Sequence, residues 1–191
     1  MSEQPLPILM SEAEYLALPE EIARTIEVVH GNVILCESPT RGHNKLAKRM
    51  ADALESARPS QPCIEIDTDV DVVLWRVPKY TFRRPDVTVY RCQPDLTSRL
   101  EASDVMMVVE VASPTTVRAD LIDKKAQYAA AGIPLYLVIE LDDKSEIEQV
   151  REFHLDAAAR EYRLTTLHGG AEIELEYPFP VTMPVEDLMR R

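Results

Sequence analysis

The chain has 191 residues, of which 46% are hydrophobic and 28% charged, as is typical of a soluble globular protein with one sizeable core. Its net charge of −12 weighs against a long nucleic-acid groove, because phosphate binding needs lysine and arginine, but it allows a local basic patch and suits carboxylates around a divalent cation. No apolar run approaches the roughly 18 residues of a membrane span, and the N-terminal residues lack a secretory-signal pattern, so we expect a cytoplasmic protein with no membrane contact.

Sequence patterns in the N-terminal third indicate a short helix, two short strands and a longer helix. Residues 11–24 open with a capping-box pattern, Ser11 followed by Glu14, which predicts a short helix. Residues 25–36 predict two short strands joined by a turn. Residues 42–57 place apolar side chains at helical spacing and predict a helix. That helix carries a local group of cations: Lys45, Lys48 and Arg49.

The middle of the chain predicts three strands. Residues 63–75 alternate apolar and polar side chains, as a half-buried strand or hairpin does. Residues 76–85 are expected to be a connector and 91–103 a loop. Strands are expected between them, at 86–90, and after them, at 104–113.

The remainder predicts a helix followed by more strands. Residues 114–132 predict a helix terminated by Gly132, and 133–143 a buried strand. Two or three strands and a terminal helical turn follow. Two strands, a helix and a strand in succession favour an α/β or α+β fold with a mixed sheet and a crossover helix, to which the flanking hairpins add antiparallel strands.

The cysteines are Cys36, Cys63 and Cys92, far apart and with no C-x-x-C pair. Without a signal sequence, this odd number predicts reduced thiols that pack as small hydrophobic side chains. No structural zinc site is expected.

Two carboxylates interrupt the apolar strands in the middle of the chain. Asp86 follows a proline at the start of one strand, and Glu110 lies near the end of the next. Neighbouring strands can bring these carboxylates to one edge, where they repel each other unless a cation lies between them. With Lys124 on the following helix, they would form a hydrolytic set that holds Mg²⁺ or Mn²⁺ and polarises a phosphate. The alternative is structural: Asp86 caps a strand, and Glu110 pairs with Lys124 or Arg118.

Several motifs, in this order, resemble the Uma-two family of putative restriction endonucleases, within the PD-(D/E)XK nuclease superfamily. They are T-I-E-V-V-H-G-N-V at 25–33, S-P-T-R-G-H at 38–43, P-D at 85–86, E-V-A-S-P at 110–114, D-x-x-x-K-x-x-x-Y at 120–128 and A-G-I-P-L-Y at 131–136. The resemblance covers roughly residues 12 to 145. It implies one restriction-endonuclease-like domain over residues 1–191, with extra N-terminal and C-terminal antiparallel strands.

The resemblance also implies the catalytic residues. Asp86 and Glu110 match the metal ligands, with Mg²⁺ or Mn²⁺ as the cofactor. The usual lysine position is occupied by Ala112, and Lys124 on the following helix matches a displaced lysine that positions the attacking water. Its neighbour Lys125 is the alternative.

Further residues are candidates for supporting roles. Glu27 matches an acidic residue of the first strand, either a further ligand, a base behind the ligands or an exposed carboxylate. His43 could touch phosphate or water at a helix start, or serve as a cap. Arg83 and Arg84 could bind a phosphate or be solvated. Three other histidines, His30, His154 and His168, are expected to be structural or exposed, and Tyr128 and Tyr136 are expected to be core residues.

The implied activity is metal-dependent hydrolysis of phosphodiester bonds in nucleic acid, with DNA the expected substrate and a homodimer the expected assembly. Two alternatives stay open. The missing lysine at position 112 and the acidic charge favour a nuclease-fold module that binds without useful turnover. The same charge suits a hydrolase of a small phosphoester, which needs no basic groove.

Overall fold

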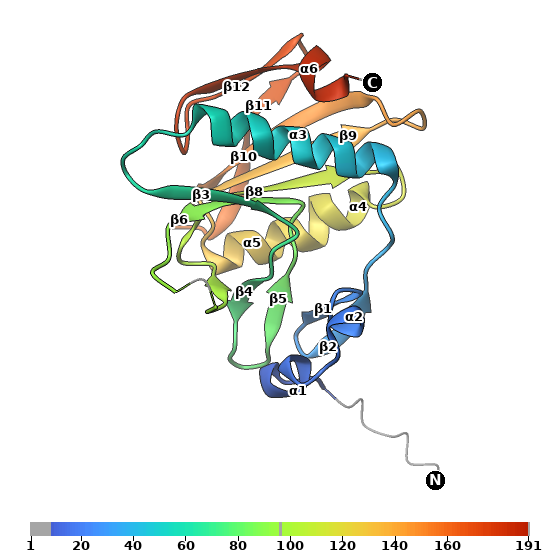
Figure 1. Cartoon of the computed structure of the whole chain (residues 1–191), viewed down its shortest axis with the longest axis vertical. Helices are drawn as coiled ribbons and strands as arrows, with labels where there is room; N and C mark the ends of the chain where they lie inside the picture. The colour runs from blue at the N-terminus through green and yellow to red at the C-terminus, as the bar shows by residue number, and fades with distance from the viewer. Residues whose placement is uncertain (1–8, 96, 191) are drawn as a thin grey trace.

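A mixed β-sheet forms the centre of the molecule (Figure 1). In the computed structural model, which describes residues 9–95 and 97–190, this sheet has six strands in the order β11-β10-β9-β8-β6-β3. Strands β8 and β9 run parallel, and the neighbouring pairs run antiparallel. The strands are β3 (Ile64–Thr68), β6 (Val87–Arg91), β8 (Val105–Ala112), β9 (Leu135–Leu141), β10 (Ile147–Asp156) and β11 (Glu161–His168). The predicted α/β fold with a mixed sheet is confirmed.

The predicted crossover helix joins the parallel strands β8 and β9. It consists of α4 (Val117–Ala119), a π-helical turn η1 (Asp120–Lys124) and α5 (Lys125–Ala131). It ends at Gly132, whose φ of 87° lies in the left-handed region that glycine adopts without a Cβ clash. The wider π turn is a departure from the regular helix expected, and turns of this kind are frequent at functional sites.

Helix α3 (Arg41–Ala57) packs on the sheet through a stripe of apolar side chains. Leu46, Met50 and Leu54 are buried there, as their helical spacing predicts. The helix begins after Thr40, whose hydroxyl accepts a hydrogen bond from the His43 N–H. None of the described helices is long and apolar enough to cross a membrane.

Strand β8 separates two apolar cores, because its side chains point alternately to the two faces of the sheet. Met107, Val109 and Val111 belong to the core that contains α3. Val108 and Ala112 belong to the core that contains α5. Glu110 lies between these last two in the alternation, so its side chain faces the crossover helix.

A second sheet in the described residues has the order β2-β1-β5-β4-β7. Its strands are β1 (Ile26–Val29), β2 (Asn32–Leu35), β4 (Val72–Trp75), β5 (Thr81–Arg83) and β7 (Leu100–Glu101). The helices α1 (Glu12–Leu16) and α2 (Glu20–Ala23) adjoin it (Figure 1). The predicted hairpin β1–β2 and the capping box at Ser11 are confirmed.

Three expectations for residues 63–103 were wrong in part. Residues 63–75 are not a hairpin, since β3 joins the six-stranded sheet and β4 the second one. The expected connector contains β5, and the expected loop contains β7. These short strands were missed because they pair with segments distant in the sequence, which local patterns do not reveal.

The C-terminal part adds the predicted antiparallel strands. Strands β10 and β11 form a hairpin at the sheet edge, and β12 (Glu172–Leu175) pairs with β13 (Val181–Pro184). Helix α6 (Val185–Met189) follows, confirming the terminal helical turn, and lies beside α3 (Figure 1).

The prediction of three reduced, packed thiols was wrong. Cys63 and Cys92 form a disulfide with their Cα atoms 5.4 Å apart. Cys63 precedes β3 and Cys92 follows β6, and these strands are antiparallel with Ile64 opposite Arg91. The pairing register therefore places the two cysteines opposite each other. Cys36 is a free thiol on an exposed residue, not a core residue.

Candidate metal-dependent catalytic site

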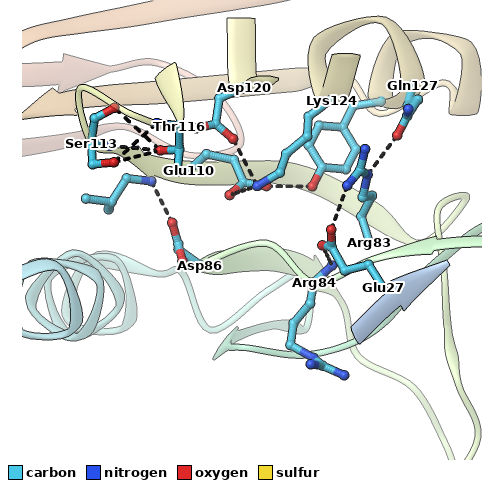
Figure 2. Close-up of polar contacts among 12 residues, drawn as sticks. Glu27, Arg83, Arg84, Asp86, Glu110, Ser113, Thr116, Asp120, Lys124 and Gln127 are labelled. Atoms are coloured by element: carbon cyan, nitrogen blue, oxygen red, sulfur yellow. Dashed lines mark hydrogen bonds and ion pairs between the residues drawn. The ribbon is translucent and has the colours of Figure 1, made fainter. Parts of the chain in front are cut away.

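Asp86 lies between β5 and β6, and both of its carboxylate oxygens have a partner. Oδ2 accepts a hydrogen bond of 2.6 Å from the Val111 N–H of β8 (Figure 2). Oδ1 lies 2.8 Å from Nε2 of His43. Strands β6 and β8 pair with Val87 opposite Val109, so one further step places Asp86 opposite Glu110. The two residues therefore lie at facing positions of neighbouring strands, as the sequence leads us to expect of their backbones.

Glu110 is buried against the crossover helix. Its Oε2 lies 2.8 Å from the ammonium of Lys124, and its Oε1 accepts a 2.7 Å hydrogen bond from the Tyr128 hydroxyl. The same ammonium lies 2.9 Å from Oδ1 of Asp120. The Glu110 and Asp120 side chains are only 3% exposed. One lysine thus bridges two carboxylates in a region nearly closed to water (Figure 2).

The charges at this site perturb one another strongly. Burial raises the pKa of Glu110 to about 8; the ammonium of Lys124 opposes this shift, and the negative charges of Asp86 and Asp120 add to it. Burial alone would lower the pKa of Lys124, but Glu110, Asp120 and Glu27 outweigh it and hold that pKa above its ordinary value. Lys124 therefore carries the positive charge of the cluster.

The imidazole of His43 contacts the carboxylate of Asp86. Burial lowers the pKa of its imidazole, but the hydrogen bond and the charge of Asp86 outweigh burial, so the net shift is upward. His43 therefore presents a readily protonated group at the start of α3, beside Asp86. This is the place where the sequence predicts a contact with phosphate or water.

Both carboxylate oxygens of Glu27 have a partner, Arg83 at the end of β5 and Arg84 directly after it. Its Oε2 lies 2.6 Å from a guanidinium nitrogen of Arg83, and its Oε1 accepts a 2.8 Å hydrogen bond from the Arg84 N–H. Arg83 also donates to the side-chain oxygen of Gln127 at 2.7 Å. This buried chain of contacts ties the second sheet to α5 next to Lys124 (Figure 2).

The charged groups of two candidates for substrate contact, Arg84 and Lys125, contact residues other than Asp86 and Glu110. The guanidinium of Arg84 points away from Glu110, toward Asp71 at 2.8 Å and the Arg24 carbonyl at 2.7 Å (Figure 2). The ammonium of Lys125 lies 4.5 Å from the centre of the Phe153 ring. Of the two neighbouring lysines, it is Lys124 that contacts Glu110.

Some residues of the site escaped the sequence interpretation. Tyr128 is a core residue as expected, but its hydroxyl also donates to Glu110; its place four residues after Lys124, on the same helical face, was the available signal. Asp69 follows β3 with a φ of 55°, in the left-handed region. Burial and then the charge of Asp86 raise the pKa of the Asp69 carboxyl group. No sequence pattern marked Asp69.

Few side chains at this site could bind a metal ion. No group of three or more His, Cys, Asp or Glu side chains in the described residues is arranged to hold a metal ion. A cation here would rest on two carboxylates, Asp86 and Glu110. Mg²⁺ is commonly bound in this way, because it keeps several waters and takes one or two carboxylates together with substrate phosphate. Water and substrate phosphate would have to supply the other ligands of such a cation.

Comparisons with known proteins agree with this fold. The chain is similar in structure to a protein described as a putative nuclease belonging to DUF820 from Anabaena variabilis ATCC 29413, with a TM-score of 0.69 and 14% sequence identity, covering 94% of this chain and 97% of that one. No curated protein matches. The model of the Uma2 family, described as "Putative restriction endonuclease", matches residues 12–186. The chain therefore belongs to the Uma2 family of putative restriction endonucleases.

Proposed function

We propose that the protein is a Mg²⁺- or Mn²⁺-dependent endonuclease of the PD-(D/E)XK type that hydrolyses phosphodiester bonds of nucleic acid, with DNA as the substrate. One observation carries the proposal. The register of β6 and β8 places Asp86, just before β6, opposite Glu110 of β8, and the ammonium of Lys124 lies 2.8 Å from Glu110. Family membership supports the same reaction class.

Each residue has a role that follows from its contacts. Asp86 and Glu110 would hold the cation, which when bound polarises the phosphate and lowers the pKa of a water molecule. Lys124 stays charged and orients the attacking water or stabilises the charge on the phosphate oxygens. Glu27 assists from behind, because its negative charge helps keep Lys124 protonated. His43 orients Asp86 and offers a cation to the phosphate.

The absence of a lysine at position 112 is the main argument for a module without turnover. Ala112 is buried in the core that contains α5, so a lysine there would have no access to solvent. The π turn η1 brings Lys124 to Glu110 instead. A lysine ammonium therefore lies beside the carboxylate even though the motif lacks it, which favours the enzyme over the module. A single domain, a homodimer and a cytoplasmic location remain predictions.

The test is a cleavage assay with the full chain. Plasmid DNA, single-stranded DNA, RNA and a small phosphodiester are incubated with Mg²⁺ or Mn²⁺, and with EDTA. We expect metal-dependent cleavage of nucleic acid that is lost in Asp86→Ala and retained in Asp52→Ala, which removes an exposed carboxylate paired with Lys48 on α3. Cleavage that persists in Asp86→Ala contradicts the proposed site. Turnover of the small ester alone favours a phosphoesterase.

A further inference from the structure

A cavity of about 730 Å³ lies between α3, the turn that joins β9 to β10, and α6. Five cationic side chains line it, against one carboxylate, Glu146. They are Arg41, Lys45, Arg49, Lys144 and Arg190. The protein as a whole carries a net charge of −12, so this concentration of positive charge is opposite in sign to the rest of the molecule.

The cations of α3 form a line. Arg41, Lys45 and Arg49 are spaced four residues apart and therefore share one face of the helix. At 1.5 Å per residue they extend over about 12 Å. A row of cations matches a chain of phosphates better than it matches a single small anion.

Most of these cations have no anionic partner among residues 9–95 and 97–190. Among the described residues, the side chains of Arg41, Lys45 and Lys144 make no hydrogen bond or ion pair, and all three residues are exposed. Arg49 donates to the carbonyl of Leu188 at 2.9 Å, and Arg190 lies 3.9 Å from Asp187. Arginines outside the cavity, such as Arg83 and Arg84, are instead paired with carboxylates.

The basic cavity continues toward the catalytic carboxylates. A Cβ atom at Gly42 would lie 3.2 Å from Cβ of Ser145, so the first turn of α3 lies directly against the turn after β9. Ser145 also lines a second cavity of about 360 Å³, which contains His43. His43 in turn contacts Asp86. The row of cations therefore starts within one helical turn of the proposed metal site.

We infer that this basic groove binds the sugar-phosphate backbone of the nucleic acid on one side of the bond to be cleaved. The inference rests on the proposed function and adds to it a surface and a mode of binding. Lysine and arginine contacts to phosphate position a strand without reading its sequence, so the groove provides affinity and register but no base preference. Binding through it must weaken steeply with salt, since each phosphate contact releases counterions.

The test compares two triple variants of equal net charge. The groove variant is Arg41→Gln/Lys45→Gln/Lys144→Gln. The control is Lys48→Gln/Lys79→Gln/Arg163→Gln, which removes three positive charges from exposed residues that do not line the cavity. Binding of a fluorescent duplex of about 20 base pairs, which at about 3.4 Å per base pair is longer than the groove, is measured by anisotropy in EDTA over a series of salt concentrations.

We expect the groove variant to lower the slope of log K against log salt by about 2 to 3, because each lost contact contributes about 0.9. The control variant should keep the wild-type slope. Equal slopes in the two variants would overturn the groove, and so would a wild-type protein that binds no duplex. Polyglutamate that binds wild type as tightly as the duplex would also overturn it, since the groove would then accept any polyanion.

Failure of the groove and failure of the proposed function are distinguishable. If wild type cleaves DNA in Mg²⁺ while both triple variants bind the duplex alike, the proposed function stands and the groove proposal fails. If wild type binds the duplex through the groove but cleaves no phosphodiester, the groove proposal stands and the proposed function fails.

Discussion

The ammonium of Lys124 lies 2.8 Å from the carboxylate of Glu110, although the two residues are 14 positions apart and belong to different elements. The contact exists because β8 points Glu110 toward the crossover helix and because the π turn η1 widens that helix at Lys124. A lysine ammonium therefore lies beside Glu110 although position 112 is an alanine.

Lys124→Gln should lower the free energy of unfolding by about 3 kcal/mol or more, because it leaves Glu110 and Asp120 buried without their shared cation. Urea unfolding measures the change. Lys125→Gln is the matched control, with an expected loss below about 1 kcal/mol, since the cation–π contact of that lysine with the Phe153 ring is weak. Equal losses in the two variants would contradict the bridging role of Lys124.

Glu110 should make the protein less stable as the pH rises. Its pKa is about 8 in the folded chain against an ordinary value of 4.5, so the folded state holds a proton that the unfolded state releases between these values. The stability from this group is complete below about pH 4.5 and is lost as the pH approaches 8.

The measurement is the free energy of unfolding across this pH range for wild type and for Glu110→Gln. The wild-type curve should fall more steeply with pH, because the amide does not titrate. Glu161→Gln, at an exposed position of β11, should follow wild type. Parallel curves for wild type and Glu110→Gln would rule out a raised pKa.

Metal binding should require both carboxylates. In calorimetric titrations with Mg²⁺ or Mn²⁺, Asp86→Ala and Glu110→Ala should each abolish the binding seen in wild type, because two carboxylates are the minimum donor set here. Asp52→Ala should bind as wild type does. Absence of binding in wild type would mean that Asp86 is held by His43 and the Val111 N–H alone, as in a structural role.

Glu27 and Arg83 should be important for stability. They form a buried ion pair at 2.6 Å, with side chains 7% and 6% exposed. Glu27→Gln should cost about 3 to 5 kcal/mol by leaving the guanidinium unpaired. Glu20→Gln, which breaks an exposed pair with Arg24, should cost less than about 1 kcal/mol. Thermal and urea unfolding report both values, and comparable losses would mean that the buried pair adds nothing.

The Cys63–Cys92 disulfide should stabilise the fold by closing a loop of 29 residues. Chain-entropy arguments give about 3 to 4 kcal/mol for a loop of this size. Cys63→Ser/Cys92→Ser, or wild type under reducing conditions, should lose that amount in urea unfolding. Cys36→Ser, at the free thiol, should be neutral. If reduction leaves the stability unchanged, the bond does not constrain the unfolded chain.

Much of the fold followed from local patterns. The apolar stripe of α3, the capping box at Ser11, the glycine that ends α5 and the apolar strands around Glu110 are signals carried by residues close in sequence. The short strands β5 and β7 carried no such signal, because partners far along the chain determine them.

Neighbouring residues with the same charge show most clearly what the sequence alone does not predict. Arg83 and Arg84 lie at and after the end of β5, and the structure directs one to Glu27 and the other to Asp71. Lys124 and Lys125 are successive helical residues, about 100° apart around the axis, so only one of them reaches Glu110. Composition treats the members of each pair alike, and the packing separates them.

The sequence by itself determined the family and the mixed fold, since ordered motifs and hydrophobic periodicity are local properties. The tertiary structure decided which lysine meets Glu110, which arginine holds Glu27, and which cysteines join. Those outcomes depend on strand register and on the phase of a helix with a π turn, where a shift of one residue turns a side chain to a different neighbour.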